Sequence, residues 1–108
     1  MNNDIQDSTD IYKNLSILYA QYTQENYFNQ KILEHMSKIF HSSTGEQDTI
    51  SKYLNFREIH GFYFDLIILD NRFGLDICYK ILKINPNQRI IIRVKLDNNE
   101  NLSDFYIK

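Results

Sequence analysis

Cysteine, proline and glycine are all scarce in this chain of 108 residues, which contains one Cys, one Pro and three Gly. A lone Cys78 excludes an intramolecular disulfide framework, and the low content of Pro and Gly excludes collagen-like and low-complexity chains. Hydrophobic residues make up 43% and charged residues 24% of the sequence, which excludes wholesale disorder. The length then predicts one domain around a single core.

A long hydrophobic run and a signal-like start are missing as well. The longest apolar run, residues 66–69, is far shorter than the roughly 20 residues that span a bilayer. Cys78 is expected to be a small buried hydrophobe, and one unpaired cysteine fits a reducing compartment. We therefore expect a cytoplasmic protein that has no membrane partner.

Blocks of positive charge are absent too. The chain carries 12 Lys and Arg against 14 Asp and Glu, a net charge of −2, so we expect no direct binding of nucleic acid. It contains neither a Walker loop nor a G-x-G-x-x-G segment, and its three histidines lack the spacing of metal ligands. No pair of nucleophile and base stands out, so we do not expect an enzyme.

Continuous apolar runs predict strands that are covered on both faces, as in a parallel sheet. The strongest run lies in residues 64–70 (FDLIILD), which contain Asp65 and Asp70 near their two ends. Further runs predict strands over residues 15–20 and 89–94, and residues 104–108 could form a last short strand.

Amphipathic spacing predicts helices between these strands. The first helix covers residues 23–40 and the third covers residues 75–84. Between them, Ser43 and Glu46 fit a capping box that would begin a second helix, and Gly61 breaks its pattern. A short strand is expected between the first two helices.

The alternation of strands and helices predicts an α/β domain over residues 15–108, after a polar leader of residues 1–14. In a parallel sheet, functional groups gather at the carboxyl ends of the strands. Tyr22, Asp70 and Val94 lie at or just beyond three of these ends. We therefore expect them to share one edge of the sheet.

The order of these segments resembles the receiver domain of two-component response regulators. The resemblance depends on residues 64–70 with the helix led by Gly74, on residues 85–87 (NPN), and on residues 104–108 (DFYIK), which are similar to the closing strand of the family. It covers residues 15–108. It implies a flavodoxin-like parallel sheet flanked by helices, and a histidine kinase or another signalling protein as the partner.

The resemblance also implies roles for two charged residues. Asp70 matches the phosphoacceptor, and a carboxylate at a strand end can attack a phosphoryl donor as a nucleophile. Lys108 matches the lysine that pairs with the phosphoryl oxygens, and it would end the last strand at the same edge. Receivers use Mg²⁺ as a cofactor, so the resemblance implies a metal site that includes Asp70.

Several positions depart from the pattern of the family. Gln21 and Tyr22 stand where receivers have the acidic pair that holds Mg²⁺, and Val94 stands where they have a switch hydroxyl. Asp70 alone would form a poor magnesium site, since magnesium favours carboxylate and water oxygens in an octahedron. Asp65 cannot replace the pair, because it lies at the opposite end of the same strand.

Two mechanisms follow from the resemblance and its departures. A degenerate receiver could still accept a phosphoryl group on Asp70 and switch between two states. Alternatively, a pseudo-receiver could act without phosphorylation, as a protein-interaction or dimerisation module. The changes at Gln21, Tyr22 and Val94 favour the second mechanism.

The chain leaves little room for the last two helices of a receiver. The segment between Val94 and Lys108 is too short for the fourth helix, and no residues follow for the fifth. Part of one sheet face would then be apolar and bare. Leader residues Ile5, Ile11 and Tyr12 could fold over it, a homodimer could cover it, or the chain could be part of a longer protein.

Overall fold

The computed structural model describes residues 14–22, 31, 33–35, 37–73, 75–95 and 102–106. The α/β character expected from the sequence is confirmed. The elements are, in chain order, β1 (Ser16–Gln21), β2 (Ile39–Thr44), α3 (Glu46–His60), β3 (Leu66–Asp70), the 3-10 turn η1 (Asn71–Phe73), α4 (Asp76–Ile84), β4 (Ile90–Lys95) and β5 (Leu102–Tyr106).

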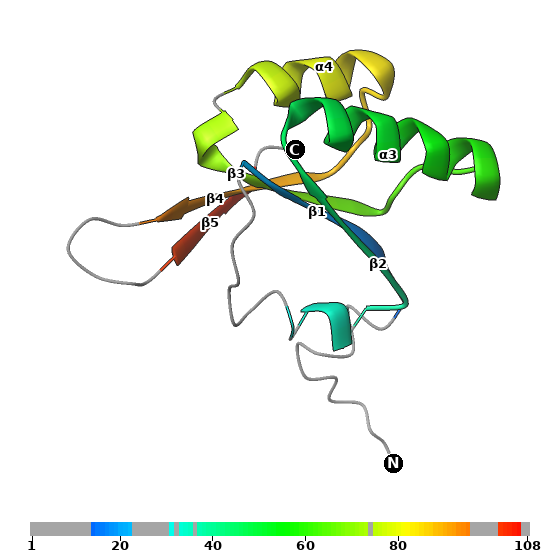
Figure 1. The fold of residues 1–108 in the computed structure, drawn as a ribbon, viewed down its shortest axis with the longest axis horizontal. Coiled ribbons are helices and arrows are strands. Elements are labelled where there is room, and N and C mark those ends of the chain that lie inside the picture. Colours follow the sequence, from blue (N-terminus) through cyan, green and yellow to red (C-terminus); the bar gives the residue numbers. More distant parts are fainter. Residues whose placement is uncertain are drawn as a thin grey trace.

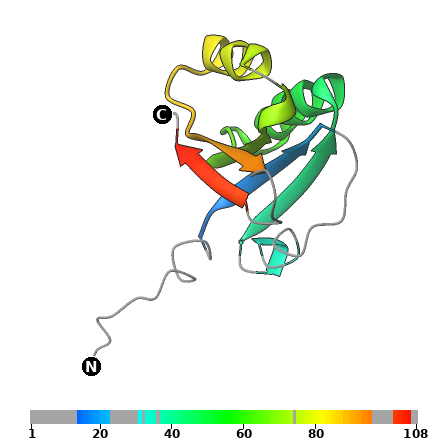
Figure 2. The same cartoon turned by 90° about the vertical axis from the view of Figure 1, so that its left-hand side faces the viewer.

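A single sheet with the strand order β2-β1-β3-β4-β5 forms the centre of the described structure (Figures 1 and 2). The first four strands of this order are mutually parallel, and β5 is antiparallel to β4. The parallel sheet predicted from the continuous apolar runs is thus confirmed for β1 to β4. Their carboxyl ends meet at one edge, which the sequence had marked as the functional edge.

Helices α3 and α4 lie side by side on one face of the sheet (Figure 1). The strand side chains of this face alternate with those of the other face, as the pleat requires. They pack with Tyr53 and Phe56 of α3 and with Ile77 and Ile81 of α4 in the larger of two core clusters. The strand residues of this cluster are Leu18, Ala20, Ile67, Leu69, Ile90 and Ile92.

The opposite face of the sheet carries a second core cluster. Its strand side chains are all at most 7% exposed, and Leu33 and Phe40 pack against them. Residues 31 and 33–35 are helical and lie on the side of the sheet away from α3 and α4 (Figure 1). On β1 and β3 this face is buried and not bare, and its buried residues are Ile17, Tyr19, Leu66 and Ile68.

The first helix was expected to continue to Phe40, and this end is wrong. Ile39 and Phe40 open β2, which pairs in parallel with β1 from Ser16 opposite Ile39 to Gln21 opposite Thr44. Ile39 packs on the cluster below α3, whereas Phe40 packs on the opposite cluster. Two adjacent apolar residues fit a strand as well as a helix end, because a strand places them on opposite faces and both faces of this sheet are apolar. Residues 23–30 of the expected helix lie outside the described residues.

The capping box expected at Ser43 and Glu46 is also wrong. Ser43 belongs to β2, where its Oγ lies 2.7 Å from Oγ1 of Thr49 in a buried hydrogen bond. Helix α3 begins after Gly45, which has a φ of 86°. The N–H of Thr44 donates to Oδ2 of Asp48 at 3.0 Å, so Asp48 satisfies a backbone donor just before α3, whereas Glu46 was expected to accept from the amide of Ser43.

The direction expected for the last strand is wrong as well. β5 begins with Leu102 opposite Lys95, at the carboxyl end of β4, and finishes with Tyr106 opposite Ile91. It therefore runs toward the amino ends of the parallel strands. A parallel strand needs a crossover of about a dozen residues or more, and residues 96–101 are too few. Lys108 itself lies outside the described residues.

Gly61 ends α3 in the left-handed region, with a φ of 84°, and its N–H donates to the carbonyl of Arg57 at 2.8 Å. A Cβ at this position would meet no atom within 4 Å, so only the backbone conformation opposes a side chain. We expect Gly61→Ala to lower the free energy of unfolding by about 1 kcal/mol. Gly61→Asn should lower it less, since Asn tolerates this conformation. Urea denaturation tests both variants, and equal losses would contradict the argument.

Candidate functional site

Asp70 lies at the carboxyl edge of the sheet, as the sequence predicted. It is the last residue of β3, a strand that lies between β1 and β4, and it pairs in register with Arg93. The apolar residues before it are buried on both faces, which fixes the strand and therefore the position of the carboxylate. The Asp70 side chain is 15% exposed. It is thus a partly buried charge that requires partners.

Arg72 provides most of these partners. Its Nε donates to Oδ1 of Asp70 at 3.0 Å and to Oδ2 at 2.9 Å, and its Nη2 also donates to Oδ2. The backbone N–H of Arg72 donates to Oδ1 at 3.0 Å, which closes a turn from residue 70 to residue 72. The guanidinium fork therefore holds both carboxylate oxygens, the geometry in which Arg–carboxylate pairs are strongest.

The protonation of Asp70 reflects these contacts. Burial alone would raise the pKa of the carboxyl group, but the side-chain and backbone hydrogen bonds from Arg72 outweigh it. A backbone hydrogen bond from Tyr22 acts in the same direction, so the net pKa of Asp70 is lowered. Asp70 is accordingly an ionised carboxylate at neutral pH. Its acceptor capacity, about four lone-pair sites, is used by the donors of Arg72 and Tyr22.

Tyr22, one of the two residues at the acidic-pair positions, lies in the same cluster. Its ring meets the ring of Phe73 edge to face, with 5.7 Å between the centroids. The Cζ of Arg72 lies 5.8 Å from the centroid of the Tyr22 ring, within the range of a cation–π contact. Tyr22 therefore supports the guanidinium with its ring and the Asp70 carboxylate with its backbone.

The residues at this edge do not fit the magnesium ion that the receiver resemblance implies. Gln21 is 3% exposed, and its backbone carbonyl accepts the N–H of Gly45 at 2.8 Å. Tyr22 supplies no carboxylate, and Asp70 is held by Arg72. Among the described residues, no group of three His, Cys, Asp or Glu side chains could hold a metal ion. The donor set therefore lacks the second carboxylate that a receiver would bring to the metal.

Val94 lies at the same edge as Asp70, one residue beyond Arg93 in β4. The antiparallel pairing of β5 brings Ser103 directly opposite Val94. A hydroxyl-bearing residue thus stands on the neighbouring strand, although Val94 itself has none.

Asp65 lies at the other end of β3 from Asp70, as expected, and has a structural partner there. Its Oδ2 accepts the N–H of Ser16 at 2.9 Å and the hydroxyl of Ser16 at 3.1 Å. The N–H of Asp65 donates back to Oγ of Ser16 at 3.0 Å. These bonds join the starts of β1 and β3, so the two carboxylates of this segment act at opposite edges of the sheet.

Arg72 is the site residue that the sequence interpretation missed. A signal was present in the spacing, because a residue two positions after an aspartate can close a turn on its carboxylate. An arginine at that position can add its side chain to the same carboxylate, as Arg72 does.

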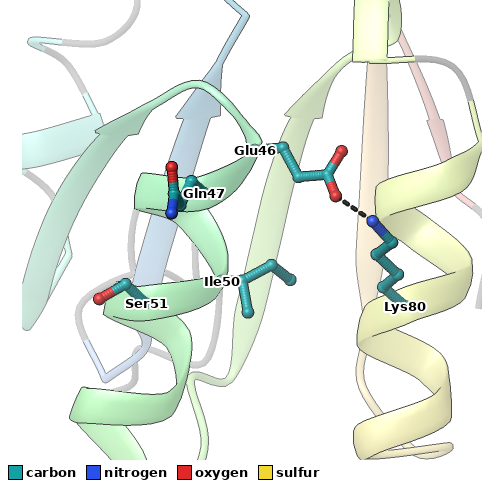
Figure 3. A pocket seen from close by; sticks show the side chains of 5 residues that line it. All are labelled: Glu46, Gln47, Ile50, Ser51 and Lys80. Carbon is teal, nitrogen blue, oxygen red and sulfur yellow. Dashed lines mark hydrogen bonds and ion pairs between the residues drawn. The ribbon is translucent and has the colours of Figure 1, made fainter.

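An open groove lies between α3 and α4 (Figure 3). An ion pair between Lys80 of α4 and Glu46 of α3 crosses it, and Asp70 is not among its lining residues. The groove is thus separate from the carboxylate cluster. It has a volume of about 570 Å³ and is lined by Glu46, Gln47, Ile50, Ser51 and Lys80.

Cys78 is 1% exposed on the inner side of α4, as the sequence predicted, and burial raises the pKa of its thiol. The thiol is therefore a packed, poorly nucleophilic group.

In the described part of the chain, no helix has the length and apolar character needed to cross a membrane.

Comparisons with known proteins identified no relative of this chain. No protein-family model matches the chain, and no match was found among curated proteins or among solved structures. The resemblance to receivers therefore depends on the motifs of the sequence and on the order in which they occur.

Proposed function

We propose that this chain is a degenerate receiver domain of two-component signalling, a pseudo-receiver that acts through protein contacts without phosphorylation of Asp70. The observation that carries the proposal is the position and state of Asp70. It ends β3 at the carboxyl edge of the parallel strands, yet both of its oxygens accept hydrogen bonds from Arg72. The first half of this observation favours a receiver, and the second favours one that is not phosphorylated.

The strand order supports the receiver part of the proposal. The order β2-β1-β3-β4-β5 agrees with the flavodoxin-like order 2-1-3-4-5, in which the edge beside the first and third strands is the functional one. Asp70 is the last residue of β3, and Tyr22 directly follows β1. The antiparallel β5 is a departure from the all-parallel order. It lies at the far end of the sheet from β2 and finishes with Tyr106 opposite Ile91, at the edge of the sheet opposite to Asp70.

The chemistry around Asp70 supports independence from phosphorylation. A carboxylate attacks a phosphoryl donor through an available oxygen, and a metal neutralises the charge that is transferred. Here the oxygens of Asp70 already accept charged hydrogen bonds, and Gln21 and Tyr22 add no carboxylate for a metal. A phosphoryl group on Asp70 would have to displace Arg72. The partner in this proposal is a cytoplasmic histidine kinase or another signalling protein, which recognises the surface of the domain.

Beryllofluoride, a mimic of the phosphoryl group, tests the proposal on the full chain. We expect no saturable change of amide NMR shifts around Asp70 when beryllofluoride and millimolar Mg²⁺ are added. Asp70→Asn is the matched control, because the amide keeps the shape of the carboxylate. A magnesium-dependent receiver measured in the same buffer shows that the reagent is active. Saturable binding that requires Mg²⁺ and disappears in Asp70→Asn would overturn independence from phosphorylation.

A further inference from the structure

The cluster around Asp70 joins residues from two strand ends. Tyr22 follows β1, whereas Asp70 and Arg72 belong to the end of β3 and to the turn η1. The backbone of Tyr22 donates to the carboxylate, and its ring lies beside the guanidinium of Arg72. A residue at a position where receivers hold a metal thus contacts both members of the ion pair.

The guanidinium has the properties required of a resident cation at this position. It carries a permanent positive charge, it binds both oxygens of Asp70, and it is planar enough to lie against an aromatic ring. Tyrosine is a suitable neighbour, because its ring face attracts a cation. An acidic residue at position 22 would instead compete with Asp70 for Arg72. The replacement of an acid by Tyr22 and the presence of Arg72 therefore fit each other.

We propose that Arg72 is the built-in counter-ion of Asp70 and takes the charge-neutralising place that a divalent cation has in a receiver, with Tyr22 as its support. The inference rests on the proposed function. It explains how the carboxylate at the carboxyl edge of the sheet stays in one charge state. The carboxylate is neutralised by the chain itself, so neither the concentration of Mg²⁺ nor a phosphodonor changes its charge. Arg72 is a positioning residue in this scheme, because it fixes the state of Asp70.

Competition between Arg72 and Mg²⁺ tests the inference. The background variant is Gln21→Glu with Tyr22→Asp, which restores an acidic pair, and the test variant adds Arg72→Ala. Magnesium alone is titrated into each full-length protein, and the amide shifts of residues 21, 22 and 70 are followed. We expect the added Arg72→Ala to tighten Mg²⁺ binding about tenfold or more, because a charged bidentate hydrogen bond no longer competes.

Two further variants separate competition from a general structural effect. Arg57→Ala in the same background removes an arginine on the last turn of α3 and should leave the Mg²⁺ affinity unchanged. Arg72→Lys keeps the charge without the fork, and we expect an intermediate affinity. Retained amide dispersion shows that each variant is folded.

The outcomes for the two proposals are distinguishable. Equal Mg²⁺ affinity with and without Arg72, or no Mg²⁺ binding after its removal, would overturn the role of Arg72 and leave the pseudo-receiver proposal standing. Binding of beryllofluoride by the wild-type chain would overturn the pseudo-receiver proposal instead. Tighter Mg²⁺ binding on removal of Arg72 alone, unchanged by Arg57→Ala, supports the counter-ion.

Discussion

Replacing Ile67 by alanine is expected to lower the free energy of unfolding by about 2–5 kcal/mol. Ile67 is fully buried on β3, where it pairs in register with Leu18 of β1 and Ile90 of β4. Its side chain belongs to the cluster that α3 and α4 cover. Neighbours on rigid strands cannot collapse into the cavity that alanine would leave, so the loss falls at the larger end of the range for core substitutions.

Ile59→Ala is the matched control for this prediction, since it removes the same atoms from a side chain that is 76% exposed on α3. We expect a change within about 0.5 kcal/mol for the control. Urea denaturation with a common slope measures both differences. The whole free energy of unfolding of a small domain is about 5–15 kcal/mol. The loss at Ile67 should therefore appear as a large shift of the urea midpoint. Similar midpoints for the two variants would contradict the packing of β3 described above.

The sequence predicted the parts of the fold that depend on burial alone. The apolar run before Asp70 indicated a strand covered on both faces, and the structure confirms both this strand and the position of Asp70 at its carboxyl end. The end of α3 at Gly61 was also predictable, because a glycine suits the left-handed conformation that closes a helix. These features follow from local patterns that have one physical solution.

The remaining features depend on pairing, which a local pattern does not encode. Ile39 and Phe40 are apolar neighbours that fit a helix end or a strand, and only their pairing with β1 decides for the strand. The residues of β5, LSDFY, form no continuous apolar run that would indicate the direction of the strand. The short connection between Lys95 and Leu102 was the available evidence for the reversal of β5.

The position of the candidate site was predictable from the sequence, but the ionic pairing of its carboxylate was not. Asp70 was identified from its strand end, but its ionic partner was not, because Arg72 lies in a turn where side-chain direction is set by the local backbone. Tyr22 was interpreted as the loss of an acid. The structure gives the residue a positive role, since its ring and its backbone both contact the ion pair. A departure from a family pattern can therefore be part of a different, self-consistent site.

Alkaline pH is expected to destabilise the fold through Tyr53, a fully buried residue of α3. Its hydroxyl donates to Oε1 of Gln88 at 2.7 Å and accepts from Nδ2 of Asn85 at 3.3 Å. Its ring stacks on Tyr63 with 5.0 Å between the centroids. Burial raises the pKa of Tyr53 from 10.0 to about 12. The hydrogen bond from Asn85 opposes this shift, and the electrostatic effect of Tyr63 adds to it.

The sign of the effect follows from proton linkage. The folded state holds the Tyr53 proton more tightly than the unfolded state. The contribution of this proton to the free energy of unfolding is therefore fully present below the unfolded pKa of 10.0. It is lost as the pH rises from that value through the folded pKa of about 12. The loss should reach about 1.4 kcal/mol near pH 11 and between about 2 and 3 kcal/mol at still higher pH.

Comparison with Tyr53→Phe isolates this contribution from the other groups that titrate at high pH. At neutral pH the wild-type protein should be more stable than the variant by about 1 kcal/mol, because phenylalanine leaves the Gln88 amide without its hydroxyl partner. Above pH 10 the variant lacks the ionisable hydroxyl, so the difference should shrink and then change sign. Tyr79→Phe, on the exposed surface of α4, reports the effect of losing a hydroxyl outside the core. A difference between wild type and Tyr53→Phe that stays constant to about pH 11 would show that this buried hydroxyl does not link folding to pH.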